Sequence, residues 1–175
     1  MTELDDQFGP VIPPQNGLKA WEQNEQLLCY ELNQSSARQL SNLLATATEG
    51  GMLLAVAIAV TVIWIIADDG SMVFALEETI VEGGTSRSPR MRGIPLSGNV
   101  KPLGHPLLVN GSGARIAGEL YLDRNEDDAL IWVLNNRSGR YGMHRSRTRA
   151  HLDNAAELLR RYGVIVQAEF FEVIT

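Results

Sequence analysis

Two residues in the second half of the chain have the types and settings that acid–base chemistry needs. His105 stands between a glycine and a proline near the end of a long polar segment, and a histidine side chain titrates near neutral pH. Glu119 lies in the otherwise apolar stretch 116–122, where a carboxylate that faces inward needs a partner. We take Glu119 as the candidate general base or transition-state stabiliser, and His105 as a candidate acid, base or orienting group. The alternatives are a loop histidine bonded to backbone and a glutamate that faces water.

A third group of polar residues fills the segment 135–142, which reads NNRSGRYG. It combines amides, guanidinium groups, a hydroxyl and a phenol around a glycine. It also joins a predicted strand to a predicted helix, which is a common place for ligand contacts. A well-bonded structural turn is the alternative. Below, Ser138–Tyr141 is called the SGRY loop, and the candidate ligand-binding residues here are Asn136, Ser138, Gly139, Arg140 and Tyr141.

Arginines gather in two stretches that contain no acidic residue, 85–118 and 137–149, although the net charge of the chain is −6. Basic clusters within an acidic chain are more informative than the net charge. They predict a site for an anionic small molecule or a nucleotide, with a solvated arginine face as the alternative. The candidates in the first stretch are Arg87, Arg90 and Arg92. The pattern gives no strong nucleic-acid signal.

Several classes of site have no counterpart in the sequence. The chain contains no Walker loop, no G-x-G-x-x-G and no G-x-S-x-G. Its three histidines lack zinc-ligand spacing, so we predict no metal site, and no cofactor is identified. Cys29 is the single cysteine, which excludes a disulfide within the chain.

The elements that must position these groups follow from the hydrophobic pattern. We expect residues 1–17 to be a flexible acidic arm, because they are rich in proline, glycine and acids. Residues 18–175 are expected to form a single α+β domain, with N-terminal helices packed on a mainly antiparallel sheet of hairpins. A C-terminal helix and a closing strand complete it, and 83–106 is expected to be a long loop. The predicted helices are 18–33, 36–48 and 150–162, and the predicted strands are 62–67, 72–76, 107–109, 116–122, 129–134 and 164–173.

Residues 51–67 form an apolar run whose only polar side chain is Thr61. Alternation of branched residues with alanine favours a buried strand, and the alternatives are a buried helix turning into a strand or a membrane contact. The run is shorter than the roughly 20 residues of a membrane-spanning helix and has no basic flanks. We therefore expect no membrane partner. The acidic N-terminus lacks a signal-peptide pattern, so we expect the protein in the cytoplasm, or in a target-cell cytosol after delivery.

Several segments resemble, in order and approximate spacing, a domain family found in the core of plant IQ-motif calmodulin-binding proteins and in bacterial, effector-like proteins. The family signature reads roughly HSS, then AGE, then SGHY. The resemblance covers about residues 62–165. Here Pro106 and Leu107 replace the two serines, and Arg140 replaces the second histidine. No IQ motif is present, so calmodulin binding is not expected. The matching positions are His105, Gly118, Glu119, Ser138, Gly139 and Tyr141.

These observations predict a small bacterial domain that binds an anionic or phosphorylated small molecule beside the SGRY loop. The expected pocket joins Glu119, His105 and the SGRY loop under the arginines of the first basic stretch. An effector-like or toxin-like transferase acting on a nucleotide would fit, although whether the chain is an enzyme is left open. The alternatives are a non-catalytic module that binds a protein partner or regulates, and a membrane-associated protein that uses 51–67.

Overall fold

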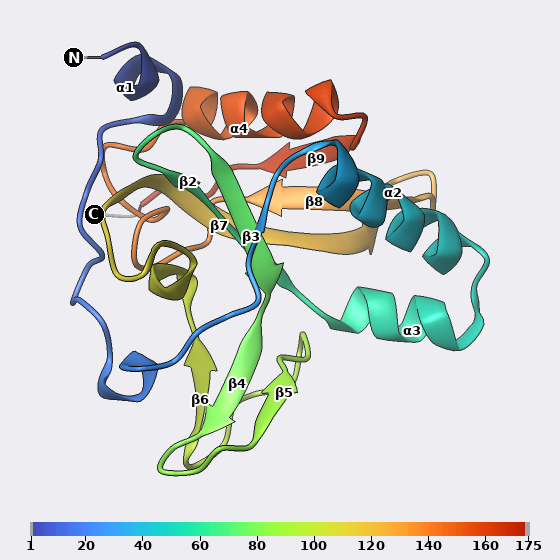
Figure 1. The fold of residues 1–175 in the computed structure, drawn as a ribbon. Helices are drawn as coiled ribbons and strands as arrows, with labels where there is room; N and C mark the ends of the chain where they lie inside the picture. The colour runs from blue at the N-terminus through green and yellow to red at the C-terminus, as the bar shows by residue number, and fades with distance from the viewer. Residues whose placement is uncertain (1, 174–175) are drawn as a thin grey trace.

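The computed structural model describes residues 2–173. A six-stranded sheet with the order β1-β3-β2-β7-β8-β9 forms its centre, and a three-stranded sheet with the order β5-β4-β6 extends from it (Figure 1). The elements are α1 (Glu3–Phe8), the 3-10 helix η1 (Ala20–Glu22), β1 (Tyr30–Glu31), α2 (Gln34–Thr48), α3 (Gly51–Ala59), β2 (Val62–Ala67), β3 (Met72–Leu76), β4 (Glu78–Val81), β5 (Arg87–Pro89), β6 (Val100–Leu103), the 3-10 helix η2 (His105–Val109), β7 (Ala114–Arg124), β8 (Leu130–Asn135), α4 (Arg149–Arg161) and β9 (Val166–Glu169).

The main sheet confirms the α+β class predicted from the sequence. Its neighbouring strands are antiparallel except for β8 and β9, which are parallel. Parallel neighbours need a crossover, and α4 supplies it. The predicted helices 36–48 and 150–162 and the predicted strands 62–67, 72–76, 116–122 and 129–134 are confirmed to within a few residues.

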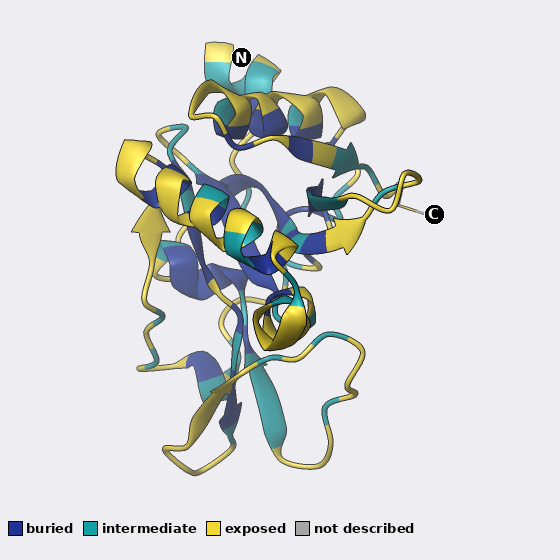
Figure 2. Ribbon diagram, turned by 90° about the vertical axis from the view of Figure 1, so that its right-hand side faces the viewer, coloured by how far each residue is buried: buried dark blue, intermediate teal, exposed yellow. Residues whose placement is uncertain are grey.

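Both faces of the main sheet are covered, which explains the continuous apolar run of β2. Trp64 and Ile66 pack on one face with side chains of α2 and α4. Ile63 and Ile65 pack on the other face with Leu108 of η2 and with Tyr141. Because successive side chains of a strand point to opposite faces, a strand buried on both sides has no polar alternation. Figure 2 shows the buried sheet between these layers.

The acidic arm lies against the body of the domain in this structure. Phe8 of α1 is buried, and Asn154 of α4 donates a hydrogen bond of 2.9 Å to the carbonyl of Gln7. Asp5 pairs with the buried Arg115 at 2.8 Å. Figure 1 shows α1 beside α4. The flexibility of the arm stays a prediction.

Three of the predicted elements are wrong. Residues 18–33 contain the short η1 and β1 in place of a helix, because their apolar side chains anchor separately: Trp21 Nε1 donates to the carbonyl of Pro102 at 3.0 Å. The predicted strand 107–109 belongs to η2, which has a proline at its N-terminus. The predicted loop 83–106 contains β5 and β6, which pair with β4.

The apolar run 51–67 divides into a helix and a strand, so the strand favoured for its first part is wrong. Residues 51–59 form α3, and β2 begins at Val62. Alanine has a high helix propensity, and its small side chain is compatible with the spacing of a helix as well as with that of a strand. The alternation with alanine therefore did not distinguish the two. Helix α3 also carries apolar side chains all round and is largely exposed, with Met52 at 81% and Leu53 at 59% exposure (Figure 2). Among residues 2–173, no helix has the length and apolar character needed to cross a membrane.

Candidate functional site

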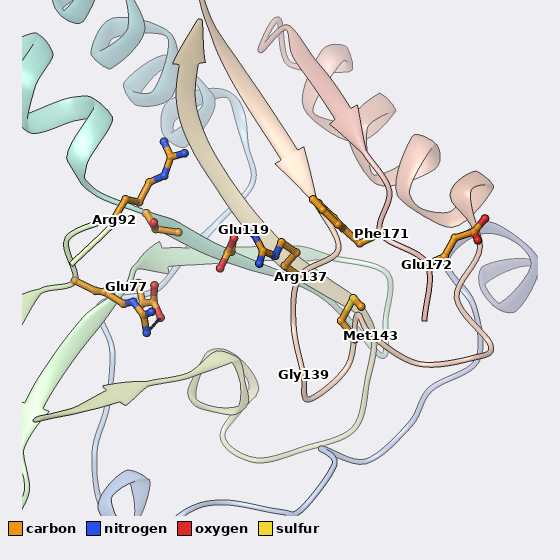
Figure 3. A pocket seen from close by; sticks show the side chains of 11 residues that line it. Glu77, Arg92, Glu119, Arg137, Gly139, Met143, Phe171 and Glu172 are labelled. Atoms are coloured by element: carbon orange, nitrogen blue, oxygen red, sulfur yellow. Dashed lines mark ion pairs between the residues drawn. The ribbon is translucent and has the colours of Figure 1, made fainter. Parts of the chain in front are cut away.

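An open cleft of about 790 Å³, called here the main cleft, lies beside several of the predicted site residues. It lies beside the start of β2 and the end of β3, and the segments that follow β5, β8 and β9 complete its wall (Figure 3). Its lining has three glutamates and three arginines beside apolar groups. The lining residues are Thr61, Glu77, Arg90, Arg92, Gly93, Glu119, Arg137, Gly139, Met143, Phe171 and Glu172.

Strand register brings the two glutamates Glu77 and Glu119 to one face of the sheet. Ile63 of β2 pairs with Ala75 on one side and with Glu119 on the other. The Glu77 N–H donates to the carbonyl of Thr61 at 2.8 Å, so the pairing of β2 and β3 continues past their ends. Residues two apart in a strand share a face, and therefore Glu77 follows Ala75 on the Glu119 side.

Glu119 is held by three hydrogen bonds. The buried Asn135 donates to Glu119 Oε2 at 3.2 Å, and its Oδ1 accepts from the Glu119 N–H at 3.0 Å. Trp64 Nε1 donates to the carbonyl of Glu119 at 3.2 Å. The carboxylate that the sequence singled out therefore has a fixed orientation at the cleft. Asn135 belongs to the polar segment 135–142 that the sequence singled out, although it was not among the candidate ligand-binding residues.

Glu77 is the cleft residue that the sequence missed most clearly. Its side chain is only 12% exposed, and Arg90 lies 3.5 Å from Oε1. Burial raises the pKa of Glu77 to about 7; the charge of Arg90 opposes this rise, and that of Glu119 adds to it. Glu77 can therefore carry a proton near neutral pH. The only signal in the sequence is a pair of acids directly after an apolar strand.

Arg137 supplies a cation whose side chain is not used elsewhere in the fold. Its guanidinium lies over the ring of Phe171, with 5.0 Å from Cζ to the ring centroid. Within residues 2–173 the guanidinium makes no hydrogen bond or ion pair, whereas the backbone N–H of Arg137 donates to Asn135 Oδ1 at 2.9 Å. Asn136, predicted to bind ligand, instead fixes Phe171: Nδ2 donates to the Phe171 carbonyl at 3.0 Å and Oδ1 accepts from its N–H at 2.7 Å.

The three arginines predicted to lie above the pocket have different surroundings. Arg90 and Arg92 line the cleft, whereas Arg87 pairs with Glu25 and Glu78 outside its lining. Arg92 donates to the carbonyl of Leu122 at 2.9 Å and lies over the ring of Tyr121, 3.8 Å from its centroid. Arg90 is consequently the more available of the two for a ligand.

His105 lies behind the cleft and is part of the framework. Its Nε2 is 2.8 Å from the carbonyl oxygen of Gly118, so this nitrogen carries the proton and donates. Burial lowers the pKa of His105 to about 4, with Arg140 adding to the effect. The ring is therefore neutral at physiological pH, and it supports the strand immediately before Glu119.

The SGRY loop contributes mainly to packing. Ser138 and Tyr141 are buried, and the Tyr141 hydroxyl donates to the carbonyl of Ser112 at 2.8 Å. Burial raises the pKa of Tyr141. Arg140 points away from the cleft and pairs with the buried Glu22 at 2.6 Å, while its other nitrogen contacts the carbonyl of Gly17. Among the described residues of this loop, Gly139 alone lines the cleft. The shared pocket of His105, Glu119 and Tyr141 is not formed.

Two glycines allow the segment after β8 to lie directly on β7. A Cβ atom on Gly118 would be 1.7 Å from the carbonyl oxygen of Asn135, and one on Gly142 would be 2.0 Å from that of Ala117. No side chain fits at such distances. These contacts place Asn135 and Arg137 beside Glu119. Gly118 and Gly142 therefore determine the shape of the cleft, although neither of them lines it.

A second, smaller hollow of about 580 Å³ adjoins the main cleft and shares Glu172 with it. It is called here the basic hollow. Its buried member, Arg147, is already committed to the carbonyls of Tyr141 and Pro10. The other lining residues are His144, Arg145, Thr148, Arg149, Phe170 and Val173. The basic stretch 137–149 is thus divided between the two hollows.

Comparisons with known proteins gave no assignment. No protein-family model, no curated protein and no solved structure matches the chain significantly. Within residues 2–173, no cluster of three or more histidine, cysteine, aspartate or glutamate side chains is arranged to hold a metal ion. The site is therefore interpreted from its own geometry.

Proposed function

We propose that the protein binds a phosphorylated sugar or a nucleotide in the main cleft. The observation that carries this proposal is the Arg137 guanidinium, which stands in the cleft wall without an ionic partner among residues 2–173. A guanidinium binds phosphate oxygens through paired hydrogen bonds, which makes arginine well suited to this ligand class.

The mixed lining of the cleft favours a ligand that has both an anion and hydroxyl groups. Arg137 and Arg90 offer hydrogen-bond donors to a phosphate. Glu77 and Glu119 accept hydrogen bonds from hydroxyls when ionised. Phe171 adds an apolar surface at the rim. A simple inorganic anion would leave the remaining carboxylate oxygens of Glu77 and Glu119 without donors, whereas a sugar phosphate matches both kinds of group.

A thermal-shift titration tests this proposal. The probes are inorganic phosphate, ribose 5-phosphate and AMP, each against the wild type and the variants Arg137→Ala, Arg145→Ala and Arg38→Ala. Arg145 lines the basic hollow, and Arg38 is exposed on α2. A ligand at 100 times its Kd adds about 2.7 kcal/mol of stability, which corresponds to roughly 5 to 10 °C in Tm for a domain of this size.

We expect the organic phosphates to raise Tm more than inorganic phosphate does. The shift should be lost in Arg137→Ala and kept in the other two variants. Loss in Arg145→Ala alone would place the anion in the basic hollow and refute the proposed site. Absence of any shift in the wild type would refute binding of this ligand class.

An effector-like or toxin-like transferase acting on a nucleotide is the enzymatic form of this proposal. The resemblance of residues 62–165 to a family with bacterial, effector-like members supports it. Glu119 is the residue that we expect to act on the ligand, because Asn135 orients its carboxylate at the cleft.

A second function, binding of a protein partner, is favoured by helix α3. Its exposed apolar side chains include Met52, Leu53 and Val56. Exposed apolar patches of this kind mark interaction sites in soluble proteins. Sedimentation velocity over a range of concentrations, compared between the wild type and Leu53→Ser, measures whether α3 joins copies of this chain. A concentration-independent monomer would leave only a different protein as partner.

A further inference from the structure

We propose that the main cleft hydrolyses the glycosidic bond of a bound nucleotide, with Glu77 as the general acid and Glu119 as the carboxylate that stabilises the sugar cation and activates water. This inference rests on the proposed function, because it assigns a reaction to the same ligand class in the same cleft. It also adds Glu77, which the sequence did not single out, as a catalytic residue.

The positions of the two carboxylates fit a sugar placed between them. Glu119 belongs to β7, and Glu77 directly follows β3, so the two residues flank the β2 segment on opposite sides and face the same hollow (Figure 3). Neighbouring strands are about 4.8 Å apart, and Glu77 is opposite Thr61 whereas Glu119 is opposite Ile63, so the two backbones are separated by roughly 12 Å along the diagonal. Two glutamate side chains that converge over this distance can reach opposite sides of one bond, which is the arrangement that glycoside hydrolysis uses.

The surroundings of the two carboxylates differ in the way that the two roles require. Glu77 is mostly enclosed, and its raised pKa of about 7 lets it hold a proton for the leaving group. Glu119 accepts the amide hydrogen bond of Asn135, which orients its free oxygen. Two carboxylates held in unlike environments are the general sign of an acid and a base that act together.

The arginines of the cleft position the substrate for this step. Arg137 stands beyond Glu119 on the segment that follows β8, and its free guanidinium would hold the phosphate at one end of the nucleotide. The ribose would then lie over the two glutamates, with the base toward Glu77. The charged groups that face Glu77 across the cleft are Arg90, Arg92, Glu119, Arg137 and Glu172.

The reaction is balanced by water alone. The bond between the sugar C1 and the base nitrogen breaks, its electron pair leaves with the base, and the Glu77 proton is transferred to the leaving base. The carboxylate of Glu119 stabilises the positive charge that develops on the sugar. Water then forms a new C1–O bond while Glu119 accepts a proton from it. Exchange of one proton between the two glutamates and solvent restores the site, and the products are a free base and a sugar phosphate.

The experiment incubates the protein with AMP, GMP, CMP and UMP and separates free base from nucleotide by chromatography. The variants are Glu77→Gln, Glu119→Gln and the control Glu78→Gln, whose wild-type carboxylate pairs with Arg87 outside the cleft lining. We expect base release by the wild type and by the control. Loss of a general acid or base lowers such rates on the order of 100-fold or more, whereas the thermal shift with nucleotide should fall far less, because Arg137 still binds the phosphate.

The pH profile of the wild type gives a second readout that requires no variant. Base release should fall as the pH rises through about 7, because Glu77 then loses the proton that the leaving base needs. A thermal shift with intact nucleotide after prolonged incubation would overturn the hydrolysis and leave the proposed binding function standing. Full activity in Glu77→Gln would overturn the role of this residue. The absence of both shift and base release would overturn the binding function and, with it, this inference.

Discussion

Replacing Glu77 by glutamine should stabilise the protein above pH 7, although it should remove the proposed activity. Burial raises the pKa of this carboxyl from 4.5 in its ordinary state to about 7 in the folded state. The unfolded chain therefore loses its proton at lower pH than the folded protein does. Between pH 4.5 and pH 7 the free energy of unfolding therefore falls as the pH rises. Above pH 7 it is lower by the full difference of about 3 kcal/mol.

Glutamine keeps the shape of the side chain and does not ionise, so the variant should avoid most of this loss. Its gain over the wild type should be near zero at pH 4.5 and should grow to a few kcal/mol at pH 8; the pKa of about 7 already includes the opposing effect of Arg90. The assay is urea unfolding of both proteins at intervals from pH 4.5 to 8.5, read as the difference in unfolding free energy at each pH.

The difference between the two proteins is the informative quantity, because His105 acts in the opposite direction. Burial lowers the pKa of His105 from 6.5 to about 4, so the folded state resists protonation and stability falls as the pH decreases from 6.5 toward 4. This contribution is the same in both proteins and cancels. A difference that does not change with pH, or a less stable Glu77→Gln at pH 8, would refute the reasoning about this carboxyl.

Three further predictions concern the framework of the site. Asn135→Ala should leave nucleotide binding largely intact and reduce base release strongly, because Glu119 loses the amide that orients it; a thermal-shift titration and the base-release assay in parallel measure the two effects. Gly118→Ala should prevent folding, since its Cβ would meet a backbone oxygen at 1.7 Å, and a native-like circular dichroism spectrum with cooperative melting would contradict this. Tyr141→Phe removes a buried hydrogen bond to the Ser112 carbonyl and should cost about 1 to 3 kcal/mol in urea unfolding without a change in activity.

Hydrophobic patterning predicted most of the main sheet and its two principal helices. Strands β2 and β7 and helix α4 were evident because each has a long apolar pattern, bounded by turn residues such as Gly163, whose φ of +84° ends the helix. The N-terminal segment was not predictable in this way. Its apolar residues serve as separate anchors on distant parts of the fold, and such contacts leave no local period in the sequence.

The site was predicted only in part, because strand register and loop contacts decide which polar groups meet. Glu119 was identified from its place in an apolar strand, and it does line the cleft. Glu77 belongs to the same cleft only through its pairing across β2, which the sequence does not specify. Arg140 was one of the candidate ligand-binding residues of its loop, yet the buried Glu22 of the N-terminal segment already pairs with it.

Three buried positions act largely as a frame around Glu119. His105 holds the carbonyl before it, Gly118 admits the neighbouring backbone, and the buried Tyr141 fixes the loop that follows β8. None of these side chains needs to contact a ligand for the cleft to form. These three positions therefore determine how the backbone around the cleft is assembled, whereas the proposed chemistry depends on the cleft residues around them, Glu77 and Arg137 above all.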